Sequence, residues 1–239
     1  MSTIKVSYRF ELAEGTTEVV DLELDTKTVE LVGNVPADVP SWAKLDFHQC
    51  PHCPLSSATD PDCPLMANLA GIVGKFDRIL SHDEVDLEVV LPERRVAGRT
   101  TAQRALGSLL GLVIATSGCP RTAFLKPMAR YHVPLADEDE TLYRASSMYL
   151  LAQYFMRQAG GETDFDLKGL ESLYKELRTV NAAIVQRLRE STSADSLINA
   201  VILLDLYARF MPYAIEDSLD EFKHLFTPYL EGSGKPPAD

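Results

Sequence analysis

The feature that most constrains this chain is a proline directly after each of its four cysteines. The four steps are Cys50-Pro51, Cys53-Pro54, Cys63-Pro64 and Cys119-Pro120, in a chain of 239 residues with 14 prolines. At this proline content, random placement would give the pattern with a probability on the order of 10⁻⁵. Proline fixes its own φ and disfavours the helical region for the residue before it. The sequence therefore specifies the backbone at all four thiols.

The spacing of the cysteines predicts a single four-cysteine metal site. Cys50 and Cys53 form a C-x2-C pair, which can turn both sulfurs toward one ion, and Cys63 and Cys119 would complete the set. We expect a zinc ion, with an iron–sulfur cluster as the first alternative because it also takes four thiolates. Dithiol redox chemistry and unliganded thiols are further alternatives. His48 and His52 flank the pair and are candidates for hydrogen bonding to the ligands.

A second feature is a basic segment in an acidic chain. The net charge is −12, yet residues 94–132 contain seven Lys or Arg and no Asp or Glu. We hypothesise an anion-binding pocket beside the metal site, formed by the loop that follows Cys119, because Arg offers a fork and Lys a point charge to such ligands. Its candidate residues are Ser117, Arg121, Thr122, Lys126 and Arg130. The alternative is that these cations only pair with carboxylates such as those of residues 137–140.

Hydropathy patterns predict an α+β fold. Apolar residues alternate with polar ones over 4–12, which is typical of a half-buried strand, and the pattern returns over 17–24. We expect a third short strand near 28–32 and a fourth at 85–91, giving an antiparallel sheet. Helical spacing over 64–81, 100–116, 140–159, 167–190 and 194–211, with a short helix at 218–226, predicts a mainly helical C-terminal part.

This pattern divides the chain into regions. Residues 1–134 would hold the sheet, the four-cysteine site and the basic loop, and residues 135–232 would be helical. Residues 233–239 would form a flexible tail. The two larger regions could also form one continuous domain.

The function that follows from these features is that of a cytoplasmic metal-binding accessory or interaction protein without catalysis. The alternative is an enzyme or redox protein whose metal lies beside the anion pocket. The negative charge argues against nucleic acid, and no apolar stretch is long enough to predict a membrane span. Expected partners are a second copy or another protein, bound through the C-terminal helices, and a small anionic ligand.

Overall fold

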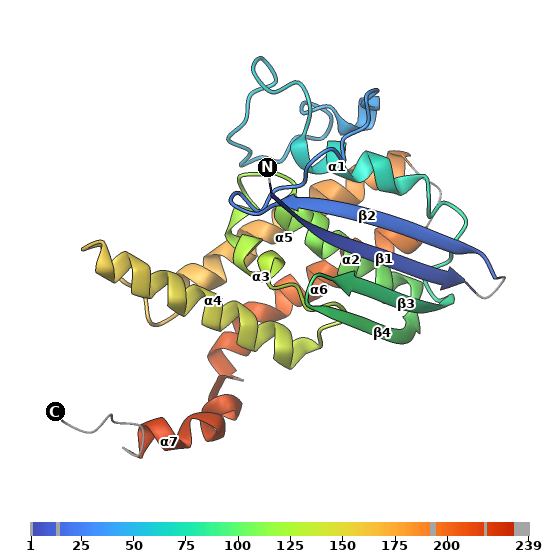
Figure 1. The fold of residues 1–239 in the computed structure, drawn as a ribbon. Coiled ribbons are helices and arrows are strands. Elements are labelled where there is room, and N and C mark those ends of the chain that lie inside the picture. The colour runs from blue at the N-terminus through green and yellow to red at the C-terminus, as the bar shows by residue number, and fades with distance from the viewer. Residues whose placement is uncertain (1, 13–14, 192–194, 218, 232–239) are drawn as a thin grey trace.

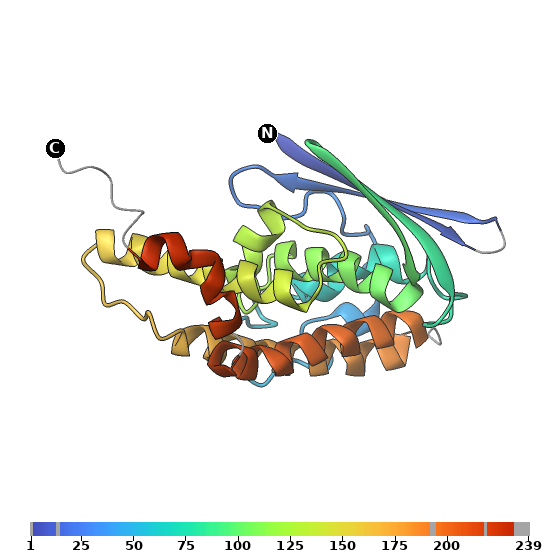
Figure 2. The same ribbon diagram turned by 90° about the horizontal axis from the view of Figure 1, so that it is seen from below.

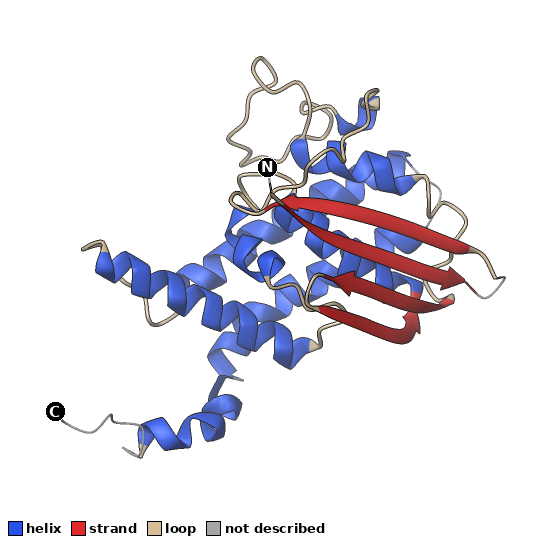
Figure 3. Cartoon of the chain, viewed as in Figure 1, coloured by secondary structure: helices blue, strands red, loops and turns tan. Residues whose placement is uncertain are grey.

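The chain folds into one antiparallel sheet covered on one side by helices. The computed structural model describes residues 2–12, 15–191, 195–217 and 219–231. Four strands pair in the order β2-β1-β3-β4: β1 spans Thr3–Leu12, β2 Thr17–Asp25, β3 Glu84–Leu91 and β4 Arg94–Thr101. The helices lie mainly in the C-terminal part (Figure 1; Figure 3 shows the same division by secondary structure). The predicted α+β class is confirmed.

Alternation of side chains places one face of the sheet in the core. On β1, Tyr8 and Phe10 are almost wholly buried, and Tyr8 lies between Val20 of β2 and Val89 of β3. The intervening residues face outward, as the two-residue period of a strand requires. Periodicity in the sequence was therefore sufficient to predict β1, β2 and β3.

The sheet differs from the prediction in two strands. Residues 28–32 do not form a strand: the Asp25 carboxylate accepts hydrogen bonds from the backbone N–H groups of Lys27 and Thr28, and Val29 has φ +56°. This turn leaves Leu31 with a single bridge to Leu24. Instead, β4 forms from a sequence with little apolar alternation. It is an edge strand, and its Arg99 pairs with Glu84 of β3 at 2.6 Å.

The helices form two layers beneath the sheet (Figure 2). The helix bounds are α1 Pro64–Val73, α2 Ala102–Thr116, α3 Lys126–Arg130, α4 Glu138–Gln158, α5 Lys168–Ser191, α6 Asp195–Asp217 and α7 Thr227–Leu230. The 3-10 helices are η1 Ser41–Ala43, η2 Ala123–Leu125 and η3 Leu219–Phe226. The middle layer contains α2, and the outer layer consists of α5 packed beside α6. In this arrangement α2 contacts the sheet on one side and α6 on the other.

Several helix ends differ from their predicted positions. Helix α1 ends at Val73, well before residue 81, and α6 continues through Pro212 to Asp217. Helix α2 begins one residue after β4 ends, so Thr100 belongs to the strand and cannot cap the helix. Helix α4 begins with a capping box in which Asp137 and Glu140 each accept the other's backbone N–H. The predicted tail at 233–239 lies outside the described residues.

Helix α6 is long and apolar enough, by length and composition alone, to cross a membrane. In this fold it packs against α2 and α5, and Leu197, Ala200 and Val201 are wholly buried. A core helix of a folded domain passes the same test of length and composition, and a third of the residues in the apolar window of α6 are buried in this fold.

One buried cation ties the loop before α1 to helix α5. Arg187 is 2% exposed, and its guanidinium donates to the backbone oxygens of Lys44 at 2.8 Å, Leu45 at 3.1 Å and Trp42 at 3.4 Å. Hydrogen bonds from a charged donor to buried carbonyls stabilise more than neutral ones. Arg187 thus fixes the start of the segment that leads to the cysteines.

We predict that Arg187→Met lowers the free energy of unfolding by about 3–5 kcal/mol, because three carbonyls lose their donor while the aliphatic stem is kept. Urea unfolding would measure the change, with Arg189→Met as the control because Arg189 is exposed on the same helix. Equal effects of the two substitutions would contradict this role.

Candidate functional site

The four cysteines come from three separate segments and line one small cavity without forming a metal-binding cluster. Cys50, Cys53, Cys63 and Cys119 all line a space of about 20 Å³ together with apolar side chains of α1 and α5. All four are free thiols. The Cys50–Cys53 turn is closed through the backbone, where Cys53 N donates to Cys50 O at 3.0 Å.

The predicted metal site is nevertheless wrong. Among the described residues, no group of three or more His, Cys, Asp or Glu side chains is arranged to hold a metal ion. Cys50, Cys63 and Cys119 pack against the hydrophobic core instead, as small apolar side chains. Neither the zinc accessory protein nor the iron–sulfur alternative is therefore supported, because both depended on these ligands.

The flanking histidines have other partners. His48 Nε2 lies 2.7 Å from a Glu190 carboxylate oxygen, and His52 Nε2 lies 3.2 Å from the Glu176 backbone oxygen. Both contacts join the cysteine loop to α5. These histidines thus help to dock the loop on the helix.

The Cys-Pro steps have backbone roles that account for part of their pattern. Cys63 is the N-cap of α1, and Pro64 occupies the first turn, where its missing N–H has no helical partner to lose. Cys119 follows Gly118, whose φ of +82° ends α2. Proline after these cysteines therefore marks element boundaries.

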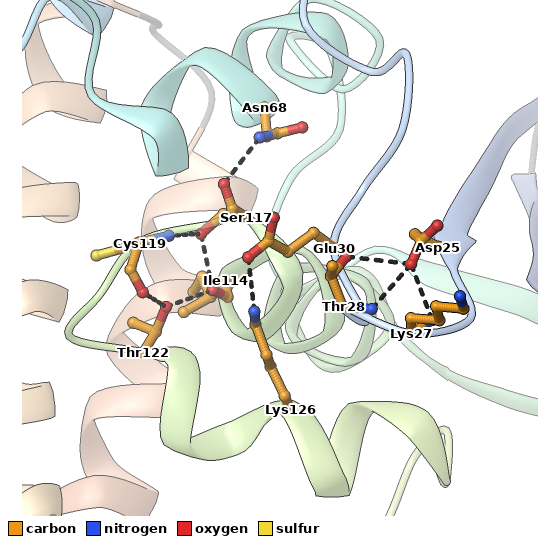
Figure 4. Close-up of polar contacts among 10 residues, drawn as sticks. All are labelled: Asp25, Lys27, Thr28, Glu30, Asn68, Ile114, Ser117, Cys119, Thr122 and Lys126. Atoms are coloured by element: carbon orange, nitrogen blue, oxygen red, sulfur yellow. Dashed lines mark hydrogen bonds and ion pairs between the residues drawn. The ribbon is translucent and has the colours of Figure 1, made fainter. Parts of the chain in front are cut away.

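The two hydroxyl residues predicted to bind an anion donate hydrogen bonds to the end of α2. Ser117 Oγ donates to Ile114 O at 3.0 Å, and Thr122 Oγ1 donates to the same oxygen at 2.7 Å (Figure 4). Both residues are buried. They satisfy a carbonyl that the helix itself leaves free at its C-terminus.

The basic candidates are likewise engaged within the protein. Arg121 pairs with Glu176 at 3.0 Å and donates through Nε to His52 O at 2.7 Å. Lys126 pairs with Glu30 at 2.6 Å (Figure 4). The Arg130 guanidinium lies 5.2 Å from the centre of the Tyr131 ring. The ion pairs use carboxylates at Glu30 and Glu176, not those of residues 137–140.

A larger cavity lies where α2, α3, α4, α5 and α6 meet. Its volume is about 180 Å³, and its walls are mostly apolar. The apolar lining includes Gly111, Leu112, Met128, Leu177 and Leu204. Polar side chains enter the cavity from α2, α4, α5, α6 and the loop after α3. They are Arg104, Ser108, His132, Thr141, Arg144, Tyr174, Asn181 and Tyr207.

A hydrogen-bonded group joins this cavity to the sheet. The Tyr8 hydroxyl of β1 donates to Ser108 O of α2 at 3.1 Å and also contacts His132 Nε2. Since a carbonyl can only accept and the hydroxyl has one proton, the proton between Tyr8 and His132 belongs to Nε2. Nδ1 of the ring is then an unprotonated acceptor.

Burial controls the charge of this group. It lowers the pKa of His132 to about 3, and the nearby Arg144 cation acts in the same direction. Burial also raises the pKa of Tyr8. Both side chains are therefore neutral at neutral pH, and Arg144 supplies the positive charge at this end of the cavity.

Three donors face the cavity from α4 and α5. Arg144 donates through Nη2 to Met128 O at 2.8 Å and Tyr131 O at 3.0 Å, which fixes the guanidinium against the loop after α3. Tyr174 is 4% exposed, and Arg144 lowers its pKa against the larger, opposing effect of burial. Asn181 is 1% exposed, and its Nδ2 has no partner among the described residues.

None of the site residues predicted from the sequence lines this cavity. Arg144, Tyr174 and Asn181 stand in amphipathic helices where their neighbours predict ordinary packing. A usable signal was present in α5, because Asn181 interrupts its apolar stripe at Leu177, Val180 and Ile184. A polar residue on a buried stripe needs a partner.

Comparison with known proteins identifies one relationship. A family model described as "Domain of unknown function (DUF6901)" matches residues 6–227. Neither the curated proteins nor the solved structures contain a match to the chain.

We predict that Cys50 reacts slowly with iodoacetamide at neutral pH. Burial raises its pKa to about 11, the other three cysteines acting in the same direction, so the reactive thiolate is scarce in the folded state. The resulting stabilisation is present below the pKa of the unfolded thiol and is lost as the pH rises through 11. Mass spectrometry of labelled peptides would measure the rate, and a folded-state rate equal to that in urea would contradict the prediction.

We predict that His132 does not titrate between neutral pH and about pH 5, because its pKa lies near 3. Imidazole nitrogen chemical shifts would report this, with the exposed His224 as the internal control. A midpoint for His132 near that of a free histidine would show that the ring is not sequestered as described.

Proposed function

We propose that this chain, which belongs to the DUF6901 family, binds a small apolar molecule bearing a carboxylate in the cavity between α2, α3, α4, α5 and α6. The observation that carries the proposal is the unpartnered amide of Asn181, which is almost wholly buried in the wall of an apolar cavity. A buried donor without a partner is costly, and a bound molecule or water would supply the missing acceptor.

The size of the cavity limits the ligand. Its volume is about 180 Å³, whereas an apolar cavity of about 150 Å³ holds benzene. One aromatic ring or a short branched chain with a small polar group would therefore fit. Ligand sites of this kind combine apolar walls with a few placed polar groups.

The polar groups favour an acceptor with negative charge. Arg144, Tyr174 and Asn181 are all donors, and Arg144 carries a full charge close to His132 and Tyr174. A carboxylate accepts several hydrogen bonds and pairs well with a guanidinium. No carboxylate side chain lines the cavity in the described part of the chain; the nearby Glu140 acts on Arg144 from outside that lining.

We predict that benzoate raises the melting temperature of the protein and that benzamide, with the same ring and no charge, raises it much less. At about 100 times its Kd, a ligand adds roughly 2.7 kcal/mol of stability, which corresponds to about 5–10 °C for a chain of this size. Differential scanning calorimetry would measure the shifts. Equal shifts from the two compounds would contradict the role of charge.

Two matched substitutions test the location. Gly111→Leu directs a side chain toward Leu204, because a Cβ at Gly111 would lie 3.8 Å from Leu204 Cδ2. The variant should keep its stability, since leucine favours helix over glycine and fills a void, but it should lose the benzoate shift. Gly74→Leu adds the same side chain in open space and should leave binding unchanged. Retained binding in Gly111→Leu would place the ligand elsewhere.

Tyr174→Phe tests the polar end with little change of shape. Loss of the hydroxyl should weaken benzoate binding by about tenfold, the value of one hydrogen bond to a charged group, and leave benzamide binding nearly unchanged. Isothermal titration would compare the two ligands.

A further inference from the structure

Helix α4 carries a row of exposed side chains whose centre is largely apolar and whose ends are charged. Alternating steps of three and four residues place Glu140, Tyr143, Ser147, Leu150, Tyr154 and Arg157 on one side of the helix. We call this set the α4 stripe. Its central side chains are well exposed, with 45% of Tyr143, 39% of Leu150 and 52% of Tyr154 accessible. Other positions of α4, at Leu142, Ala145 and Gln153, are buried.

The stripe has opposite charges at its two ends. Asp139 and Glu140 lie in the first turn of α4, and Arg157 lies in the last turn. The helix has 21 residues, so these ends are about 25–30 Å apart. Two copies packed antiparallel through this stripe would bring the acidic end of each against Arg157 of the other. Parallel packing would instead place like charges together.

The centre of the stripe suits that arrangement. An antiparallel pair in which Glu140 faces Arg157 also places Tyr143 opposite Tyr154 and the small Ser147 opposite Leu150. A small residue facing a large one at the crossing allows close packing of two helices. The same patch is used by both copies, as a two-fold interface requires.

The C-terminal segment adds to the apolar area beside the stripe. Phe222 of η3 packs edge-on against Tyr143, with ring centres 6.1 Å apart. From there the segment leads away from the body of the molecule (Figure 1). It exposes four large apolar side chains: Leu225 at 56%, Phe226 at 41%, Tyr229 at 74% and Leu230 at 63%.

The combined area matches that of a stable dimer. If a large side chain offers on the order of 200 Å², the stripe with its neighbours Leu151 and Phe155, together with the C-terminal segment, exposes roughly 1,000 Å². About half of this area lies on α4 and half on the C-terminal segment, and the two together are comparable with the roughly 800 Å² that each partner buries in a standard interface.

We infer that this chain forms a two-fold homodimer in which two α4 helices pack antiparallel through their stripes. The apolar centre supplies most of the association, and the charged ends set the antiparallel direction. A lipid surface is a poorer occupant, because the net charge of −12 opposes approach to an anionic bilayer.

Sedimentation equilibrium of the full chain tests this inference. The wild type should have a mass about twice the monomer's 26.4 kDa at micromolar concentration. Leu150→Asp should raise the dissociation constant at least about a hundredfold, because it buries two unpaired charges at the centre. The control Leu80→Asp alters a leucine outside α4 that is more exposed than Leu150, and it should leave the dimer intact. A monomeric wild type would overturn the inference.

Charge exchange tests the antiparallel direction. Asp139→Arg and Arg157→Glu each place like charges together in the proposed pair and should raise the dissociation constant by about tenfold. The double variant restores opposite charges between the copies and should return the constant to near the wild-type value. Additive weakening in the double variant would overturn the antiparallel arrangement.

Co-sedimentation with phosphatidylcholine and phosphatidylserine vesicles tests the lipid alternative. Wild-type protein should stay in solution with both. Binding to either vesicle that Leu150→Asp abolishes would assign the stripe to a membrane instead of a second copy.

Discussion

The burial of α2 on two opposite sides is the constraint on which the rest of the structure depends. Eleven of its 15 residues are buried, so the helix must have apolar partners in both directions. The inward face of the sheet supplies one partner and α6 supplies the other. Ending this helix inside the protein leaves carbonyls without partners, which Ser117 and Thr122 satisfy. These two residues of the segment around Cys119 therefore have a structural role at the end of α2.

The same constraint creates the cavity. Glycines at 107 and 111 leave α2 without side chains where it faces Leu203 and Leu204 of α6, and no neighbouring side chain fills the space completely. Two side chains with polar groups extend into the cavity: the neutral His132, which contacts Tyr8 of the sheet, and the Arg144 cation, which donates to carbonyls of α3 and of the residue after it. The apolar walls of the cavity strengthen the electrostatic effect of the Arg144 charge, because the local dielectric constant is low.

Much of the fold was predictable from periodicity. The apolar alternation in β1 and β2 and the helical spacing of apolar residues in α4 and α5 predicted these elements close to their observed bounds. The failures have local causes: Asp25 folds residues 25–29 into a turn by accepting backbone N–H groups, and β4 is an edge strand held by cross-strand ion pairs instead of apolar burial. Periodicity cannot report either kind of interaction.

The site was much less predictable than the fold. Cysteine spacing shows which thiols a chain can bring together, but it does not fix the direction of each sulfur, and here three of them pack against the core. The cavity residues come from five helices and the loop after α3, so each one on a helix looks like an ordinary helical position. Their common surroundings follow only from the packing of α2 on α6.

A crystal structure of the protein with bound benzoate tests the central claim most directly. The account predicts the ring between α2 and α6, with its carboxylate within hydrogen-bonding distance of the Arg144 guanidinium. A cavity containing only water in that crystal, or benzoate bound solely at another surface, would contradict the account.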